Sequence, residues 1–568
     1  PIGQDAPEYI QLVAKGQYQQ ALSLIYDKNP LPGITGHICD HQCMFSCSRK
    51  DYEGAVRIRD MKRIAMEKGW DEYQASWQQP VQKQTARCAV IGAGPAGLSA
   101  AYFMARAGFP VVVFEKERDA GGIIRNVLPN FRIPEEVIQQ DIDFVKAHGV
   151  QFEFGCDSKL DVLDLKHSGF DYVFLGIGAE KGNRMPLEGD RSRLLPSLQF
   201  LRQFNEAPET IQLGRRVVVV GGGNTAMDSA RAAWKVPGVE QVQVFYRRTE
   251  EEMPADREEY GNAVKDGAHF QFLTNPESMT EDGMLTCRIM KLGEPDASGR
   301  RRPVATEETC TLSVDTIITA IGEQADSELL NKMGIPLGTD GWAAIDRQTK
   351  ETGVSNVFLI GDAHTGPSTV VRCIDEARRA TDTAIARHQA LVHTNTEIPV
   401  ADEKHIRARR GLIPMSSVPV DEAEAFARQE GERCLECNHI CNKCVDVCPN
   451  RANVAIDIPG FKEKYQILHL DAYCNECGNC AQFCNWESKP YKEKFTVFSL
   501  MVDFENSTNS GFLVQDDMVW LRSGDKINKM TINVMGELSE VPRGQDDLCR
   551  IISHVYLNQA YLLGKVYP

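Results

Sequence analysis

The cysteines are the residues whose type and spacing point most directly to chemistry. The chain has 18 cysteines, of which nine lie between Cys434 and Cys484 and three between Cys39 and Cys47. Thiolates clustered at short intervals are typical of metal ligation, whereas disulfide frameworks are typical of short secreted chains. The clustering therefore predicts metal sites in two separate parts of the sequence.

The nine-cysteine block resembles the ligand pattern of a two-cluster ferredoxin. Its second half has the spacing C-x2-C-x2-C-x3-C, formed by Cys474, Cys477, Cys480 and Cys484. In such proteins three thiolates of a run bind one 4Fe-4S cluster and the fourth binds the neighbouring cluster. The first half is the corresponding run for the other cluster and has one cysteine more than the four that are needed. Its cysteines are Cys434, Cys437, Cys441, Cys444 and Cys448, and Pro449 follows the last of them.

The sharing of the fourth ligand predicts two 4Fe-4S clusters. The two predicted ligand sets are Cys448 with Cys474, Cys477 and Cys480, and Cys484 with Cys441 and Cys444. The last ligand of the second set is either Cys437 or Cys434, because the x3 gap between Cys437 and Cys441 departs from the usual x2. Zinc is the alternative metal, since paired C-x2-C knuckles also bind it.

The three cysteines near the start of the sequence form an incomplete set. Cys39, Cys43 and Cys47 are spaced at x3 intervals, which is one ligand short of a cubane cluster. The sequence begins with Pro1 rather than Met, so we expect upstream sequence. Cysteines in that segment are expected to complete one or two N-terminal clusters.

A first dinucleotide fold is predicted after the N-terminal cysteines. A short apolar strand ends at Ile91, GAGPAG (Gly92 to Gly97) follows, and a helical pattern comes next. Such glycines permit a tight turn and a close approach of the backbone to a pyrophosphate. The next strand ends at Glu115, where a carboxylate can bind a ribose hydroxyl. FAD is favoured over NAD because the distant segment VFLIGD, ending at Asp362, is typical of flavoproteins that return to the ribityl chain.

A second copy of the pattern begins at Arg216. The strand is followed by GGGNTA (Gly221 to Ala226), and the next strand ends in Tyr246, Arg247 and Arg248 where an acidic residue is usual. Guanidinium groups suit a 2′-phosphate, so this fold is predicted to prefer NADPH to NADH. The alternative is that the two arginines only solvate the end of a strand.

The order of these patterns predicts a multidomain chain in which the NADP fold is inserted in the FAD fold. There is no C-x2-C pair beside either glycine turn, so electrons are expected to leave through the C-terminal clusters. The predicted domains are an α-helical iron–sulfur domain (1–84), an FAD-binding α/β domain (85–205 and 323–395), an NADP-binding Rossmann-like domain (206–322), a linker (396–430), a ferredoxin-like domain with two 4Fe-4S clusters (431–490) and a small α+β extension (491–568).

The charge balance excludes some classes of partner. The chain has 63 Lys and Arg against 79 Asp and Glu, a formal net charge of -16, which disfavours nucleic acid and anionic lipid. No apolar run approaches the ~20 residues of a membrane span, and the start lacks the regions of a signal peptide. A cytoplasmic location is therefore expected.

The motifs together resemble a known family over residues 1 to 395. They are NPLPGITGHIC, GAGPAG, EKERDAGGII, NFRIP, GGGNTAMD, the arginine pair, AIGE and IGDAHTGPSTVV. This combination is similar to the small subunit of glutamate synthase and to the N-terminal half of dihydropyrimidine dehydrogenase. With its nine-cysteine block, the chain more closely resembles bacterial iron–sulfur subunits named for selenate reduction.

The resemblance implies cofactor-binding residues. For FAD they are Gly92, Gly94, Pro95, Ala96, Gly97, Glu115, Lys116, Gly121, Gly122 and Arg132. For NADP(H) they are Gly222, Gly223, Asn224, Thr225, Arg247 and Arg248. The closing motifs add Ala320, Gly322, Gly361, Asp362, Thr369 and Val370. Where dehydrogenase relatives have a glutamine as a cluster ligand, this chain has Lys62 or Arg63.

The resemblance also implies a reductase subunit. NADPH would reduce FAD, and 4Fe-4S clusters would carry electrons to other subunits of a redox complex, with a molybdenum-containing hydroxylase or purine-related enzyme as the implied partner. No residue here binds selenate, a purine or molybdopterin recognisably. Two alternatives are a self-contained oxidoreductase that reduces a small substrate, and a scaffold with remnant sites. Flow from a reduced partner to NADP+ is also open.

Overall fold

A computed structural model describes residues 2–51, 53–156, 160–295, 300–339, 341–388, 413–437, 441–461 and 465–564. These form two compact units. Unit 1 comprises 1–5, 17–40 and 59–396, and unit 2 comprises 6–16, 41–58 and 397–568. The end of the predicted FAD domain (389–395) and the first part of the predicted linker (396–412) lie outside the described residues.

The first fold of unit 1 is a parallel five-stranded sheet in the order β16-β4-β1-β2-β3. Its strands are β1 (Cys88–Ile91), β2 (Val111–Glu115), β3 (Gln151–Phe154), β4 (Tyr172–Leu175) and β16 (Val357–Leu359). β1, β2 and β4 are buried along their whole length, which suits central strands covered on both faces. Helices α6 (Pro95–Arg106) and α15 (Val370–Arg387) pack against each other beside this sheet.

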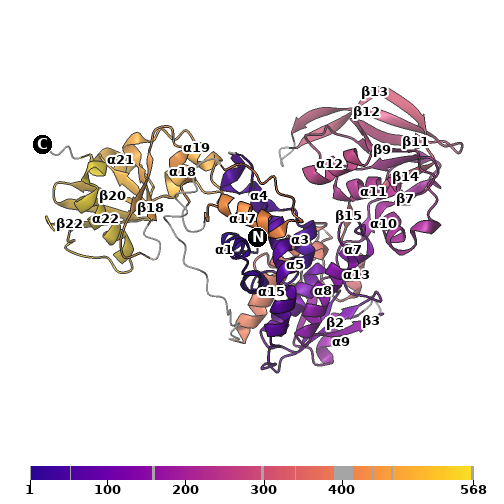
Figure 1. The fold of residues 1–568 in the computed structure, drawn as a ribbon, viewed down its shortest axis with the longest axis horizontal. Helices are drawn as coiled ribbons and strands as arrows, with labels where there is room; N and C mark the ends of the chain where they lie inside the picture. Colours follow the sequence, from indigo (N-terminus) through magenta and orange to yellow (C-terminus); the bar gives the residue numbers. More distant parts are fainter. Residues whose placement is uncertain are drawn as a thin grey trace. The chain divides into compact units, whose positions relative to one another are not determined.

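The second fold of unit 1 is another parallel five-stranded sheet, in the order β10-β9-β8-β14-β7. Its strands are β7 (Leu194–Pro196), β8 (Arg216–Val220), β9 (Gln241–Tyr246), β10 (His269–Phe272) and β14 (Thr316–Thr319). Helices α10 (Ser197–Glu206), α11 (Asn224–Trp234) and α12 (Arg257–Lys265) lie beside it (Figure 1). The two Rossmann-like folds predicted from the glycine motifs are thus confirmed. β7 and α10 pack in the second fold although they begin before residue 206, the predicted start of the NADP domain.

A smaller antiparallel layer extends the second fold. Strand β6 (Glu188–Gly189) pairs with β11 (Thr274–Met279), which is followed by the long hairpin β12 (Met284–Pro295) and β13 (Arg301–Ser313). A short ribbon, β5 (Lys181–Gly182) with β15 (Glu323–Gln324), runs between the segments that enter and leave the second fold. The remaining helices of this part are α7 (Ile123–Asn126), α9 (Val162–His167), α13 (Ser327–Lys332) and α14 (Asp362–Thr365).

Helices from the start of the chain pack on the first fold. They are α2 (Tyr18–Tyr26), α3 (Pro32–Ile38) and most of α5 (Ile58–Ser76), with α8 (Glu135–Ala147) as their partner. Asp141 of α8 accepts hydrogen bonds from the Gly33 and Ile34 amides at 3.2 and 2.8 Å, which satisfies the start of α3 from another element. An aromatic cluster around Tyr26 and Phe144 fills the space between these helices.

Unit 2 combines the rest of the N-terminal region with the C-terminal region. Helix α1 (Ala6–Ala14) packs on α17 (Ala423–Arg433), and the Gln11 amide donates to the Gly431 carbonyl at 2.9 Å. The segment 41–58 contains α4 (Gln42–Phe45) and the 3-10 helix Ser48–Asp51. The range 1–84, predicted as one domain, is therefore divided between both units.

The C-terminal part of unit 2 is one continuous six-stranded sheet in the order β17 to β22. Its strands are β17 (Asn453–Asp457), β18 (Tyr465–Leu470), β19 (Thr496–Phe498), β20 (Gly511–Gln515), β21 (Met518–Ser523) and β22 (Lys526–Thr531). The helices are α18 (Lys443–Asp446), α19 (Asn479–Gln482), α20 (Pro490–Glu493), α21 (Met501–Asn506) and α22 (Asp546–Asn558). The sheet runs through residue 490, where two domains were predicted to meet.

Within the described part of the chain, we find no helix that combines the length and the apolarity needed to cross a bilayer.

Candidate functional site

A cavity in the first fold lies at the carboxyl ends of β1 and β2. It is lined by residues of both β-strand ends, the glycine turn and the start of α15. Ten predicted cofactor residues contribute to its wall: Gly92, Gly94, Pro95, Ala96, Glu115, Lys116, Gly122, Asp362, Thr369 and Val370. In a parallel α/β sheet this edge is the usual place for a nucleotide.

The glycine turn is shaped by contacts that leave no room for larger residues. A methyl group at Gly97 would collide with the Gly92 carbonyl oxygen, and Gly92 has φ +96°. At Gly94 the nearest atom is the Gly122 Cα, 4.0 Å from the position of an added Cβ, so that side is open. Gly97 therefore serves close packing of helix on strand, whereas Gly94 faces the cavity and leaves room for a phosphate.

Two of the four acidic residues on the cavity wall, Glu115 and Asp362, were predicted from the sequence. The buried Glu115 carboxylate accepts hydrogen bonds from the Ala93 amide at 2.6 Å and the Glu117 amide at 2.9 Å. Asp362 accepts from the Ser368 amide at 3.0 Å and its hydroxyl at 2.7 Å, and burial raises the pKa of Asp362. Fixed carboxylates suit the hydroxyl-rich ribose and ribityl parts of FAD, so the residues present fit this cofactor. Cys156 also lines the cavity, although no sequence motif indicated it.

The glycine turn of the second fold is equally confined. An added Cβ at Gly222 would lie 2.6 Å from the Tyr246 ring, whereas at Gly223 no atom would lie within 4 Å. The Asn224 side-chain oxygen accepts from the Asp256 amide at 2.8 Å. Gly223 precedes α11, so the turn and the helix start at Asn224 and Thr225 present backbone N–H groups as a phosphate site requires.

The arginines at the end of β9 lie near a third arginine that the sequence did not indicate. Arg247 is exposed, and the Arg248 side chain donates to the Arg301 carbonyl at 2.9 Å. The Arg300 guanidinium donates to the Tyr246 hydroxyl at 3.1 Å. Because Arg300 comes from a hairpin more than 50 residues later, only the fold brings it to the predicted 2′-phosphate site.

The remaining predicted residues of unit 1 have packing positions. Ala320 touches the glycine turn, since a Cβ on Gly221 would meet its carbonyl, and the Gly322 carbonyl accepts from the Asn183 amide at 3.0 Å. The Gly361 amide donates to Glu376 at 3.0 Å. Among the described residues, Gly97, Gly121, Arg132 and Gly361 are not part of the cavity wall.

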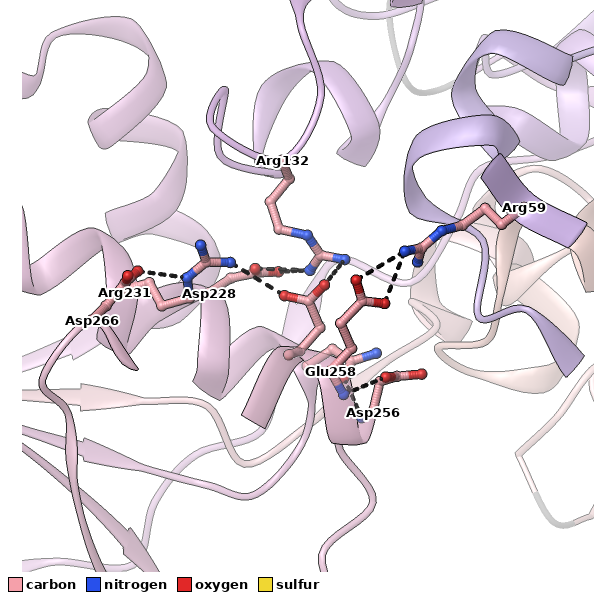
Figure 2. A network of polar contacts seen from close by, with 9 residues as sticks. Arg59, Arg132, Asp228, Arg231, Asp256, Glu258 and Asp266 are labelled. Atoms are coloured by element: carbon pink, nitrogen blue, oxygen red, sulfur yellow. Dashed lines mark hydrogen bonds and ion pairs between the residues drawn. The ribbon is translucent and has the colours of Figure 1, made fainter. Parts of the chain in front are cut away.

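Arg132 instead joins the first fold to the second (Figure 2). Its guanidinium pairs with Asp228 of α11 at 2.8 Å and with Glu259 of α12 at 2.9 Å, and all three side chains are nearly buried. Arg231 bonds to Glu259 at 3.3 Å, and Arg59 pairs with Glu258 at 2.8 Å. Burial raises the pKa values of Asp228 and Glu259, which Arg132 counteracts. The predicted contact of Arg132 with FAD stays a prediction, whereas its ion pairs are an observed link between the folds.

A second cavity lies in unit 2 and is lined by cysteines from both runs. Its wall contains Cys448 from the first run together with Cys474, Cys477 and Cys480 from the second. The Ala452 amide donates to the Cys448 sulfur at 3.2 Å, and the Glu476 amide donates to the Cys474 sulfur at 3.3 Å. Such amide contacts are typical of cluster ligands, so this set fits a 4Fe-4S cluster.

The other predicted ligand set gathers around Cys444. Burial raises the pKa of Cys444 to about 12, and its thiol neighbours Cys441, Cys480 and Cys484 contribute.

In unit 1 the Lys62 ammonium group lies 3.9 Å from the Cys39 sulfur, whereas Arg63 pairs with Glu67. Of the two residues aligned with the glutamine ligand, Lys62 is thus the one beside a cysteine.

Two family patterns match the chain. The pattern of the pyridine nucleotide-disulphide oxidoreductases covers residues 86–377, and that of dihydropyrimidine dehydrogenase domain II, a 4Fe-4S cluster domain, covers residues 1–74. The chain belongs to the pyridine nucleotide-disulphide oxidoreductase family.

Curated relatives extend this result. The chain is 54% identical over 567 residues to a protein of Escherichia coli (strain K12) named "Putative oxidoreductase YgfK", covering 100% of the chain and 55% of that protein. It is 32% identical over 504 residues to the NADPH-Fe(3+) oxidoreductase subunit beta of Geobacter sulfurreducens, covering 78% and 74%. It is 32% identical over 409 residues to the glutamate synthase [NADPH] small chain of E. coli, covering 67% and 86%.

These matches establish the class of this family member. The chain is an NAD(P)H-dependent flavin and iron–sulfur oxidoreductase, and its cofactors are FAD, NADPH and 4Fe-4S clusters. The resemblance to glutamate synthase small subunits that the motifs suggested is confirmed. The chain spans about half the length of the YgfK protein that it matches.

Proposed function

We propose that this chain is the reductase part of a redox complex, in which NADPH reduces FAD and 4Fe-4S clusters deliver the electrons to a partner enzyme. The chain's own residues position the groups. The Gly92–Gly97 turn and Glu115 would hold FAD, and the Gly222–Thr225 turn with Arg247 would hold NADPH. The hydride step then needs only alignment of the two rings, without a protein acid or base.

The observation that carries this proposal is the cysteine-lined cavity of unit 2. Cys448 is 26 residues from Cys474 in the sequence, yet both line one cavity with Cys477 and Cys480. Transfer of electrons from the flavin to a cysteine pair would need two cysteines beside a nucleotide, and the sequence has no C-x2-C pair next to either glycine turn. Thiolates gathered in this way instead support one-electron transfer through clusters.

The topology supports an inserted NADP domain. β16 joins the first sheet beside β4, although the whole second fold lies between these strands in the sequence. We propose that the first sheet with β16 forms the FAD domain, the second sheet forms the NADP domain, and residues from 431 onward hold the two C-terminal clusters.

We propose that the electron acceptor is another subunit. The relatives are named "subunit beta" of an oxidoreductase and "small chain" of a synthase, which supports a complex. A molybdenum-containing hydroxylase remains the specific candidate, supported by the family resemblance alone. A cytoplasmic location is part of the proposal, because cluster thiolates need a reducing compartment.

The experiment is an anaerobic titration of the full-length protein. Iron, sulfide, zinc and flavin are assayed, and NADPH or NADH is added while visible and low-temperature EPR spectra are recorded. Flavin bleaching with reduced-cluster signals would support the proposal. Zinc in place of iron would overturn the electron exit, and a small substrate that drives NADPH oxidation by this chain alone would favour a self-contained enzyme.

The nucleotide preference is tested with two matched double variants. Arg247→Ala/Arg248→Ala removes the predicted phosphate ligands, and we expect the KM for NADPH to rise roughly 10- to 100-fold, since charged hydrogen bonds contribute about 1.5–3 kcal/mol. The KM for NADH should change little. Arg215→Ala/Arg216→Ala removes an adjacent pair at the beginning of β8 and should leave both values unchanged. Equal losses for both nucleotides in the first variant would contradict the proposed phosphate site.

A further inference from the structure

The two-cluster pattern uses eight of the nine C-terminal cysteines, so either Cys434 or Cys437 is left over. The surroundings of the two thiols differ. Burial raises the pKa of Cys437 to about 11, and Cys441 is its first thiol neighbour, followed by Cys47. Burial also raises the pKa of the fully buried Cys434, whose thiol neighbours are Cys437 and Cys47. Both thiols therefore have Cys47 of the N-terminal segment as a neighbour, and Cys437 has Cys441 of the second predicted cluster beside it as well.

The backbone at Cys434 has the form of a ligand turn. The sequences Cys434-Leu-Glu-Cys and Cys474-Asn-Glu-Cys have the same spacing, and their third residues, Glu436 and Glu476, have φ values of +46° and +53°. In both turns the amide of this glutamate donates to the first cysteine sulfur. A left-handed glutamate is uncommon, so its recurrence marks a shared local structure. Cys434 thus has the geometry of Cys474, which lines the cluster cavity, rather than that of a packing residue.

The N-terminal segment around Cys47 is fixed against this turn within unit 2. The Ser48 hydroxyl lies 2.9 Å from the Cys437 sulfur and accepts from the Asn485 amide at 2.6 Å. The Val56 amide donates to the Cys47 sulfur at 3.4 Å. Each of the two cysteines, Cys47 and Cys434, therefore receives a backbone amide, as cluster sulfurs commonly do.

Buried charged groups hold the two segments together. The Arg49 side chain donates to the Arg433 carbonyl at 2.8 Å, and Arg433 donates to the Gly54 and Ala55 carbonyls. Lys443 pairs with Asp51 at 3.0 Å. Arg49 and Arg433 are 2% and 0% exposed, so these contacts are shielded from water and fix the position of the residues next to both cysteines.

We propose that Cys47 and Cys434 are ligands of one further iron–sulfur cluster in unit 2, to which both ends of the chain contribute. Cys43 lies in α4, four residues before Cys47 in the sequence, and is the further thiolate on the N-terminal side. Cys437 then completes the cluster of Cys441, Cys444 and Cys484. The inference rests on the proposed function, in which the C-terminal cysteines hold clusters.

The test is a double-mutant cycle on the iron content of the full-length protein. Cys47→Ala and Cys434→Ala should each remove about four iron atoms per chain, and the double variant should lose no more than either single variant. Cys549→Ala, which changes a buried cysteine of α22, is the control and should retain all iron. Low-temperature EPR after reduction should lack the same signal in both single variants.

Two results would overturn the inference. Additive losses of about eight iron atoms in the double variant would assign the two cysteines to different clusters. Full retention of iron in Cys434→Ala would make that cysteine a packing residue. Cys480→Ala distinguishes failure of this inference from failure of the proposed function. If unit 2 holds clusters, the Cys480→Ala variant should lose iron whether or not Cys47 and Cys434 share one of them. Flavin bleaching by NADPH in all variants confirms that unit 1 is folded.

Discussion

The ion pairs of Arg132 make a quantitative prediction about how the two nucleotide folds are joined. Arg132→Met removes the cation but keeps most of the side-chain volume. Asp228 and Glu259, whose side chains are 5% and 10% exposed, then lose their contacts of 2.8 and 2.9 Å. Breaking a buried pair from one side costs about 3–5 kcal/mol, because it leaves buried charge without compensation. Part of this cost is relieved for Glu259, which retains Arg231.

The assay is urea unfolding followed by flavin fluorescence and, in the FAD-free protein, by circular dichroism. At a slope near 3 kcal/mol/M, we expect the midpoint to fall by roughly 1–1.5 M. Arg132→Met/Asp228→Asn should recover part of the loss, since it removes the uncompensated carboxylate. Arg215→Met breaks an exposed pair with Glu240 in the second fold and serves as the matched control, with little change expected.

Two outcomes would refute this reasoning. A midpoint shift no larger than that of Arg215→Met would mean that the buried network contributes nothing to stability. A shift that disappears in the FAD-free protein would mean that Arg132 acts through the flavin, as the family resemblance implies, rather than through its ion pairs.

Further predictions concern the glycine turn, the cluster exit and one buried histidine. Gly97→Ala should yield protein without FAD, because the added methyl group collides with the Gly92 carbonyl. Gly94→Ala should fold and lose only flavin affinity, measured by fluorescence titration. Equal folding defects in the two variants would contradict this prediction. Cys480→Ser should abolish electron transfer to an external acceptor and lower the iron content while NADPH still bleaches the flavin; intact transfer would place the exit elsewhere. Burial lowers the pKa of His148 from 6.5 to about 4. As the pH falls below 6.5, this histidine therefore binds a proton in the unfolded chain before it does so in the folded protein. The free energy of unfolding should be lower by about 2 kcal/mol at pH 5 than at neutral pH. His148→Phe should remove that part of the pH dependence of the urea midpoint, and an unchanged dependence would show that His148 is already charged in the folded protein.

The two Rossmann-like folds and the cofactor class could be predicted from local sequence patterns. A parallel strand, a glycine turn and a helix are consecutive in the chain, so the sequence around Gly92 to Gly97 and around Gly221 to Ala226 is enough to predict each fold. The cysteine spacing is also local, and it indicated the set of Cys448, Cys474, Cys477 and Cys480 that lines one cavity.

Contacts between residues far apart in the sequence could not be predicted in this way and are seen first in the folded chain. Arg300 reaches Tyr246 through a hairpin, Arg132 reaches Asp228 across two folds, and Ser48 reaches the Cys437 sulfur through the packing of segments almost 400 residues apart in the sequence. No sequence pattern indicated these contacts, because each contact is fixed by the burial of charge and apolar surface between whole elements rather than by neighbours in the chain. The same reason explains why residues 1–84 read as one domain, whereas helix α1 packs with α17 in unit 2.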